Sequence, residues 1–156
     1  MNSEPSEAPA HERRNVGRID HIILLYRNRA NQDEARRKFT DLLGIEDWQE
    51  VGEGDEGIYI WISWSSGIEL ICPTRDVPAF QKHLDTHGEG FYAMVFGVAD
   101  LDRISSHIQQ ISGRAPHPLG KAPGPVFDKF NVAREAIVGT VGGMRLMVGE
   151  FESNGR

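Results

Sequence analysis

Hydrophobic positions along the chain form two similar series of elements. The first series opens with an apolar run at 19–26 that predicts a buried strand, and a helix ending before Gly44 follows. The helix is predicted from apolar residues at helical spacing: Ala35, Phe39, Leu42 and Leu43. Segments rich in β-branched and aromatic residues then predict three strands: 48–51, 58–64 and 68–72.

The same order restarts after a connecting helix at 77–87. An apolar strand at 91–98 leads to a helix at 101–111, and Gly113 ends that helix as Gly44 ends the first. The next segment is a Pro- and Gly-rich loop at 116–125, which could contain a short strand. Two strands at 132–138 and 144–148, joined by a glycine turn at 139–143, complete the series.

The two series are offset by about 70 residues, which indicates duplicated modules. Each module alone leaves one sheet face uncovered, so we expect an α+β fold in which two βαβββ modules form one curved, cup-shaped mixed sheet. The expected organisation is a flexible tail, one domain and a C-terminal tail: 1–16, 17–151 and 152–156. Within the domain we expect module one, a linker helix and module two: 17–73, 74–88 and 89–151.

The amino-acid composition argues against some classes of binding partner. The net charge is −6 and the basic residues form no stripe along the chain, so nucleic acid is not expected as a partner. No apolar run approaches the ~18 residues that span a bilayer, and residues 1–15 lack the apolar core of a signal peptide, so we expect a cytoplasmic protein that does not bind membranes. The single cysteine, Cys72, lies in an apolar run and is interpreted as a buried hydrophobic residue rather than a nucleophile.

Four short motifs in order carry a family resemblance: IDHI at 19–22, RKFTDLLG at 37–44, IEL at 68–70 and GEGFYAMVF at 88–96. Together they span most of 17–151. With this order and spacing the chain resembles the vicinal oxygen chelate superfamily, which includes glyoxalase I, methylmalonyl-CoA epimerase, extradiol dioxygenases and the bleomycin-resistance proteins. The GEG-aromatic motif is most similar to the epimerase. The resemblance implies a small-molecule cavity and a homodimer.

In metal-dependent members of the epimerase and glyoxalase type, four side chains hold a divalent cation. The resemblance places these four positions at His21, Glu69, Ala93 and Met147. His21 and Glu69 are residue types that bind metals, whereas Ala93 and Met147 are not suited to a divalent cation. Alanine supplies no donor and a thioether is a poor ligand for zinc, manganese or magnesium. The expectation is therefore no metal or a weakly bound divalent metal at His21 and Glu69, with Glu135 or a partner subunit as a further source of ligands.

The polar side chains that this chain has at the family's site positions suggest catalytic roles. His21 and Glu69 can form an imidazole–carboxylate pair in which His21 is the general acid/base and Glu69 orients it, or a polar pair that holds two strands in register. Tyr59 lies where the resemblance puts the epimerase's catalytic glutamate. It is predicted to donate a hydrogen bond to substrate, with a buried structural tyrosine as the alternative.

Four residues are predicted to bind substrate: Trp61, Tyr92, Met147 and Arg145. The aromatic side chains would offer surface to a planar or apolar ligand. An inward guanidinium at Arg145 would suit an anionic substrate, whereas an outward one would be a solvated strand-edge arginine.

Two classes of function remain open. The first is a lyase- or isomerase-like enzyme acting on a small carbonyl- or carboxylate-bearing molecule. The second is a non-catalytic protein of the bleomycin-resistance kind that binds an antibiotic or another aromatic or cationic ligand.

Overall fold

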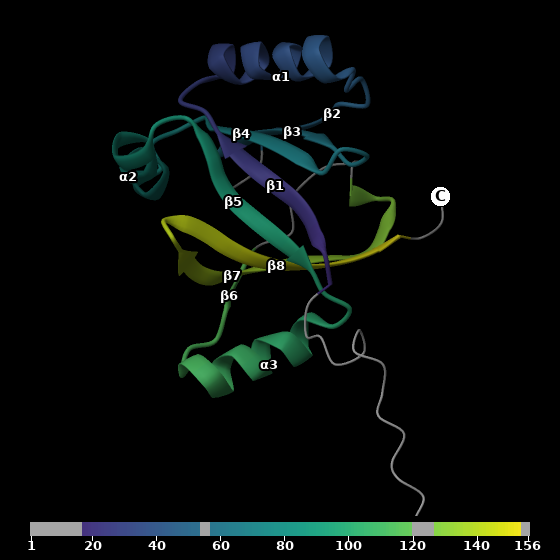
Figure 1. Ribbon diagram of the computed structural model, residues 1–156, viewed down its shortest axis with the longest axis vertical. Coiled ribbons are helices and arrows are strands. Elements are labelled where there is room, and N and C mark those ends of the chain that lie inside the picture. The colour runs from purple at the N-terminus through teal and green to yellow at the C-terminus, as the bar shows by residue number, and fades with distance from the viewer. Residues whose placement is uncertain (1–16, 54–56, 120–126, 154–156) are drawn as a thin grey trace, which may run out of the picture.

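The computed structural model describes residues 17–53, 57–119 and 127–153, and these form the expected sequence of elements (Figure 1). Module one contains β1 (Ile19–Leu25), α1 (Arg29–Leu43), β2 (Gln49–Glu53), β3 (Ile58–Ser63) and β4 (Ile68–Pro73). The linker is α2 (Pro78–His87). Module two contains β5 (Gly90–Gly97), α3 (Leu101–Ser112), β6 (His117–Pro118), β7 (Phe130–Val141) and β8 (Met144–Ser153). The α+β class and the two βαβββ modules are confirmed.

The described strands form one mixed sheet in the order β2-β3-β4-β1-β5-β8-β7-β6. At its centre β1 and β5 are antiparallel, and Ile22 pairs with Met94. The flanking pairs are reciprocal: His21 with Val95, and Ile23 with Ala93. Such reciprocity is the mark of a two-fold axis, here an approximate one between the modules. His21 and Ala93 therefore occupy corresponding positions.

The strands next to this central pair obey the same symmetry. On β4, which runs parallel to β1, Glu69 lies beside Ile23. On β8, which runs parallel to β5, Met147 lies beside Val95. Glu69 and Met147 are therefore also corresponding positions, as the resemblance implied.

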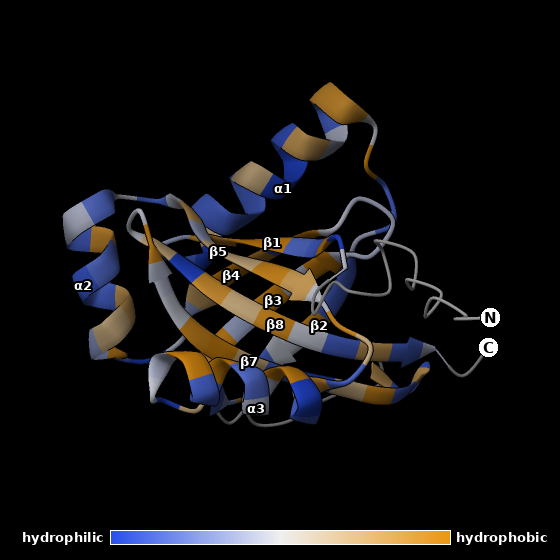
Figure 2. Ribbon diagram, turned by 60° about the horizontal axis from the view of Figure 1, so that its bottom comes forward, coloured by the Kyte–Doolittle hydropathy of each residue, from blue (hydrophilic) through white to orange (hydrophobic). Residues whose placement is uncertain are grey.

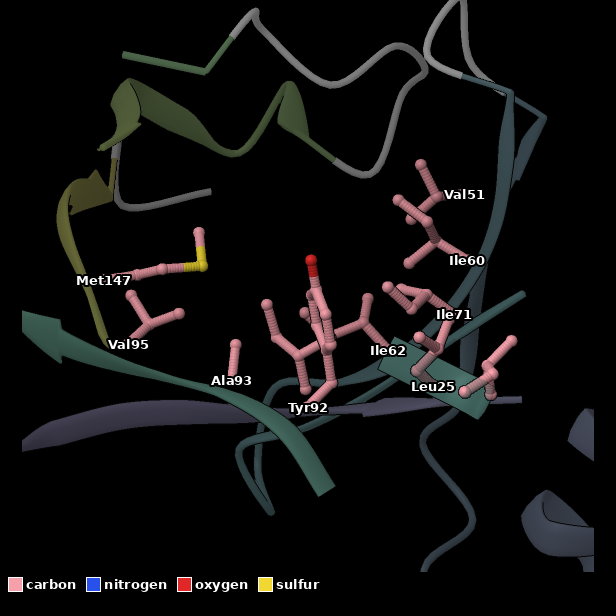
Figure 3. Packing of buried hydrophobic residues seen from close by; sticks show 11 residues of the cluster. Leu25, Val51, Ile60, Ile62, Ile71, Tyr92, Ala93, Val95 and Met147 are labelled. Atoms are coloured by element: carbon pink, nitrogen blue, oxygen red, sulfur yellow. The ribbon is translucent and has the colours of Figure 1, made fainter. Parts of the chain in front are cut away.

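The sheet curls so that its concave face encloses the main core, while α1 and α3 lie on the outside and α2 closes one end (Figure 1). Inward residues of both modules meet in this core, including Leu25, Ile62, Ile71, Val95 and Met147 (Figure 3). Because neither module alone covers its concave face, the core exists only when both are paired. None of the described helices is long and apolar enough to cross a bilayer.

Both glycines predicted to end helices do so in the left-handed conformation. Gly44 has φ 70° and Gly113 has φ 73°, and each donates its backbone N–H to a carbonyl of the last helical turn. A residue with a Cβ is strained at such a φ, whereas glycine is not.

Only part of the predicted apolar face of α1 packs against the rest of the protein: Phe39 contacts Trp48 and a buried cluster, whereas the end of the face does not. Leu42 and Leu43 are 79% and 68% exposed, and the apolar C-terminal end of α1 stands away from the sheet (Figure 2). The fully buried residue is Gln32, at the β3–β4 surface. Arginines one turn before and after it cover aromatic rings of β3 instead of presenting an apolar stripe, so hydrophobic periodicity did not identify this contact.

Gln32 yields a stability prediction. Its amide nitrogen donates to the backbone oxygens of Tyr59 at 3.0 Å and Leu70 at 2.8 Å. Gln32→Leu removes both donors, and we expect a loss of about 1–3 kcal/mol in the free energy of unfolding, measured by urea denaturation. Arg37→Leu at an exposed position of the same helix is the control. Equal stabilities of the two variants would contradict the prediction.

Some predicted boundaries are wrong. β7 continues to Val141 and turns through Gly142 and Gly143 alone, with φ 58° and 80°, so the five-residue turn expected at 139–143 is a two-residue hairpin. β8 continues to Ser153, because its pairing with β7 extends to Phe130, so a C-terminal tail beginning at 152 is too long. The expected tail at 1–16, positions 54–56 and the loop positions 120–126 lie outside the described residues.

Candidate functional site

A cavity of about 220 Å³ opens on the concave face of the sheet and is lined by both modules and α2. We call it the central cavity. Its described walls are mostly apolar, with one polar cluster and one arginine: His21, Ile23, Ile58, Ile60, Trp64, Glu69, Ile71, Val77, Ala79, Phe80, Tyr92, Leu119, Phe127, Glu135, Arg145, Met147 and Phe151. A larger hollow of about 630 Å³ lies outside the sheet by α3, where Arg134 is already paired with Asp102 and Glu150. Within the described part of the chain, the central cavity is enclosed and contains polar atoms without a hydrogen-bond partner, so it is the candidate site.

His21 is the centre of the polar cluster. It is only 2% exposed, and its Nδ1 lies 2.8 Å from Oδ1 of Asp20. Its Nε2 lies 3.3 Å from Oε2 of Glu69 and 3.4 Å from Oε1 of Glu135. These two contacts are within ion-pair distance but lack hydrogen-bond geometry, which leaves His21 Nε2 and Glu135 Oε1 as buried polar atoms without a hydrogen-bond partner. Three carboxylates thus surround one imidazole.

The β3–β4 turn positions the histidine. Gly67 has φ 66°, and a Cβ there would lie 2.8 Å from the backbone oxygen of Asp20. The Gly67 carbonyl accepts a hydrogen bond from the backbone N–H of Ile22 at 2.9 Å. This close approach, which only glycine permits, holds β1 against β4 and so brings His21 to Glu69.

The pKa values of His21 and Glu135 are both raised in this cluster. Burial alone would lower the pKa of His21, but the contacts with Asp20, Glu135 and Glu69 outweigh it and raise this pKa to about 12. Burial raises the pKa of the Glu135 carboxyl, and the neighbouring His21 offsets this only in part. Both directions favour the protonated form, so the cluster favours an imidazolium at His21 at neutral pH and a raised pKa at the Glu135 carboxyl.

These shifts predict how stability depends on pH. The folded-state pKa of His21 exceeds its ordinary value of 6.5, so its stabilising effect is complete below pH 6.5 and is lost as the pH rises toward 12. The raised pKa of Glu135 acts in the same direction. We expect the free energy of unfolding, measured by urea denaturation, to fall from about pH 6.5 to about pH 9.5, with a shallower slope in His21→Leu. Stability that is constant or rises over this range would contradict the pKa directions.

Five of the seven predicted site residues line the central cavity: His21, Glu69, Tyr92, Arg145 and Met147. Ala93, the other position carried over from the metal-binding relatives, is completely buried beneath the cavity floor (Figure 3). The catalytic and substrate-binding roles stay predictions.

Tyr59 and Trp61 were placed on the wrong face of β3. Neither lines the cavity, because Ile58 and Ile60 are the inward residues of that strand. The guanidinium of Arg29 lies 3.2 Å from the centre of the Tyr59 ring, and that of Arg36 lies 4.6 Å from the Trp61 ring. Both aromatic side chains are therefore part of the contact with α1 and cannot touch a ligand in the cavity.

Several residues of the cavity were missed or left open by sequence reasoning. Glu135 was considered as a ligand without knowledge of its strand face, and pairing with Gly149 on β8 turns it inward. Asp20, which contacts His21 Nδ1, was not assigned to the site. Aromatic side chains that approach His21 edge-on were not assigned to the site: Trp64 and Phe151, with centroids 6.3 and 5.8 Å away.

The donors here do not form a complete metal site. His21 Nε2, Glu69 and Glu135 are close together, yet no group of three or more His, Cys, Asp or Glu in the described ranges is arranged to hold a metal ion. The two corresponding positions of module two carry Ala93 and Met147, neither of which is a suitable ligand for a hard divalent cation. Weak metal binding is kept as a prediction, and no chemical step below depends on a metal.

The sequence matches no protein-family profile and no curated protein significantly. The fold, however, is similar to solved structures. Methylmalonyl-CoA epimerase from Mycobacterium tuberculosis superimposes with a TM-score of 0.63 at 20% identity, covering 87% of this chain and 89% of that one. A methylmalonyl-CoA epimerase in complex with methylmalonyl-CoA and NH4+ gives 0.62 at 21% identity, covering 90% and 96%. A Streptomyces coelicolor epimerase variant in complex with 2-nitronate-propionyl-CoA gives 0.63 at 21% identity, covering 90% and 96%.

The superpositions establish the architecture. Because the sequence identities are only 20–21%, the reaction has to follow from the residues of the site. The duplicated modules, the strand order and the corresponding positions in β1, β4, β5 and β8 agree with the expected family. The chain has the fold of the vicinal oxygen chelate superfamily, to which methylmalonyl-CoA epimerase belongs.

Proposed function

We propose that this protein is an isomerase- or lyase-like enzyme that removes and returns a proton at a carbon next to a carbonyl or carboxylate of a small organic molecule. The observation that carries the proposal is the position of two carboxylates, Glu69 and Glu135, within 3.4 Å of one buried imidazolium, His21, in an otherwise apolar cavity. Proton transfer from carbon needs a base and a positive group that stabilises the resulting enolate, and this cluster contains both.

The geometry favours a division of roles that differs from the sequence-based one. With its pKa raised to about 12, His21 stays protonated at neutral pH and is a poor base. Its Nε2–H instead can donate to a substrate oxygen on which negative charge develops. Asp20 fixes the ring through Nδ1, which is the orienting role that sequence reasoning gave to Glu69.

Glu135 is the proposed base. Its raised pKa brings it closer to neutral pH, where one group can both accept and return a proton. Glu69 approaches the same nitrogen from β4 while Glu135 approaches from β7, so a substrate bound at Nε2 would have a carboxylate on each side. Such a pair suits an isomerase, in which a proton leaves one face of a carbon and returns to the other.

The similar structures support the reaction class. They are structures of methylmalonyl-CoA epimerases, and two of them are complexes with 2-nitronate-propionyl-CoA or with methylmalonyl-CoA. The cavity of about 220 Å³ is below the ~300–1,000 Å³ typical of pockets for drug-sized ligands, so the part of a substrate that it surrounds must be small.

Proton–deuterium exchange tests the proposal. The protein in deuterated buffer is mixed with methylmalonyl-CoA or with short oxo acids, and loss of the proton signal next to the carbonyl is followed by NMR. We expect exchange of at least one compound well above the rate with an equal concentration of denatured protein. No exchange with any of them would contradict the proposal.

The alternative is a binding protein of the bleomycin-resistance kind. The observation that favours it is the aromatic wall beside His21, in which Trp64 carries a buried Nε1–H without a hydrogen-bond partner. The surrounding carboxylates would suit a cationic ligand. In this case a thermal shift with an aromatic cationic antibiotic would accompany the absence of exchange.

Assembly and location are also proposals. We propose a homodimer in the cytoplasm, as the family resemblance and composition suggest. The mass measured by light scattering at several protein concentrations tests the assembly.

A further inference from the structure

We infer that the α2 end of the central cavity binds a carboxylate group of the substrate, held by the Arg145 guanidinium and the Tyr92 hydroxyl. The inference deepens the proposed function, on which it rests for the position of the reacting carbon. It defines a substrate class: a small acid whose anionic group is separated from the reacting carbon by a short apolar chain.

Arg145 is the cavity's cation without an anionic partner. Its side chain lines the cavity, and its guanidinium carbon lies 5.0 Å from the centre of the Tyr92 ring. Among the described residues, no carboxylate forms an ion pair with it, whereas Arg27 and Arg134 are paired with carboxylates. A planar guanidinium that faces an enclosed apolar space is matched by a ligand carboxylate, which it can bind through two hydrogen bonds.

Tyr92, whose ring lies beside the Arg145 guanidinium, adds a hydroxyl to the same cavity. The pairing of β1 and β5 is irregular where Ile23 gives way to Leu24, and this bulge lets both Tyr92 and Ala93 join the inner core. The Tyr92 hydroxyl points into the space between the Met147 and Ile60 sides of the cavity (Figure 3). Burial raises the pKa of this hydroxyl, so it stays a hydrogen-bond donor at neutral pH.

The packing around Tyr92 fixes its orientation. Phe80 and His83 of α2 contact the ring edge-on, with centroids 5.5 and 4.9 Å away. Burial lowers the pKa of His83, and the nearby His87 and Arg145 lower it further, so His83 is neutral and does not compete with Arg145 for an anion. His83 thus packs against the wall of the cavity through the Tyr92 ring.

The register of β8 separates this anion-binding end from the acid/base cluster. Arg145 and Met147 are successive inward positions, about 7 Å apart along a strand. Met147 pairs with Val95, which in turn pairs with His21, so Met147 lies at the end of the cavity that contains the acid/base cluster. Arg145 lies against the Tyr92 ring at the α2 end. The wall between the two ends is apolar, with Ile58, Ile60 and Phe80, and suits methylene groups rather than further polar atoms.

Levulinate and its methyl ester are matched probes. Both contain a ketone two methylenes away from the carboxyl carbon, and only levulinate is anionic. Binding is measured by calorimetry and ketone-side exchange by NMR, for the wild type, Arg145→Gln and Tyr92→Phe. The control is Arg37→Gln, which removes an exposed arginine on the outer helix α1.

We expect levulinate to bind the wild type more tightly than its ester does. Arg145→Gln should weaken levulinate binding about tenfold to a hundredfold and leave the ester unchanged, with a smaller loss in Tyr92→Phe. Equal binding of acid and ester by the wild type, or unchanged levulinate binding by Arg145→Gln, would overturn the inference. If levulinate binding depends on Arg145 but no exchange occurs, the proposed function is contradicted and this inference is not. If exchange occurs at the same rate in Arg145→Gln and in the wild type, this inference is contradicted and the proposed function is not.

Discussion

Replacing His21 with leucine is expected to lower the free energy of unfolding by about 3–5 kcal/mol, because it removes the positive group that the described residues place between Glu69 and Glu135, whose side chains are only 14% and 25% exposed. Glu69 and Glu135 would then face each other without compensation, and Asp20 would lose its partner. The measurement is urea denaturation near neutral pH, with the midpoint compared at an unchanged denaturant slope.

Two controls separate this effect from a simple loss of packing. His117→Leu changes an exposed histidine on a short strand and should alter stability by less than about 0.5 kcal/mol. Glu135→Gln introduced into the His21→Leu protein should recover part of the lost stability, because it removes one of the uncompensated charges. A loss below about 1 kcal/mol for His21→Leu, or no recovery in the double variant, would show that the cluster is not held together by charge.

Glu135→Gln is expected to lower the rate of proton exchange about 10²–10⁴-fold while substrate binding is retained. The amide keeps the size of the side chain and its place beside His21 but cannot accept a proton from carbon. The folded protein should be as stable as the wild type or slightly more so, because a carboxyl that burial disfavours in its charged form has been removed.

The matched control is Glu152→Gln, at an exposed position of β8 whose strand partner is Val132 on β7. Exchange should be unchanged in this variant. If Glu135→Gln exchanges substrate at the wild-type rate, the base is another group, and Glu69→Gln would identify it by the same measurement. A loss of both binding and exchange in Glu135→Gln would instead show that this carboxylate holds the substrate.

The order of elements followed from the sequence because it depends on local chemistry. Apolar runs rich in β-branched residues form strands, and glycines at positions 44 and 113 end helices because their backbone is left-handed there. The offset between the modules was also correct, as the reciprocal pairing of β1 and β5 shows. The resemblance implied that His21 and Glu69 share one cavity, and the structure places their side chains 3.3 Å apart.

The faces of individual strands could not all be predicted. In β3 the alternate residues are isoleucines and aromatic side chains, and both faces are covered, one by the core and the other by α1. When both faces of a strand are buried, alternation of hydrophobic and polar residues no longer shows which face is inside. Trp61 was assigned to the cavity because an aromatic side chain suits a ligand, and Tyr59 because the resemblance puts the epimerase's catalytic glutamate at its position.

By itself the sequence determined the duplicated βαβββ arrangement, which depends on local periodicity, while the pair of His21 with Glu69 was implied by the resemblance that the short motifs carry. Only the tertiary structure decided that Glu135 completes the cluster and that Arg145 and Tyr92 share the α2 end of the cavity. Those positions depend on the register of β7 with β8 and on the bulge between β1 and β5, where a shift of one residue moves a side chain to the opposite face. Register is set by contacts between segments far apart in the chain, and no local pattern records it.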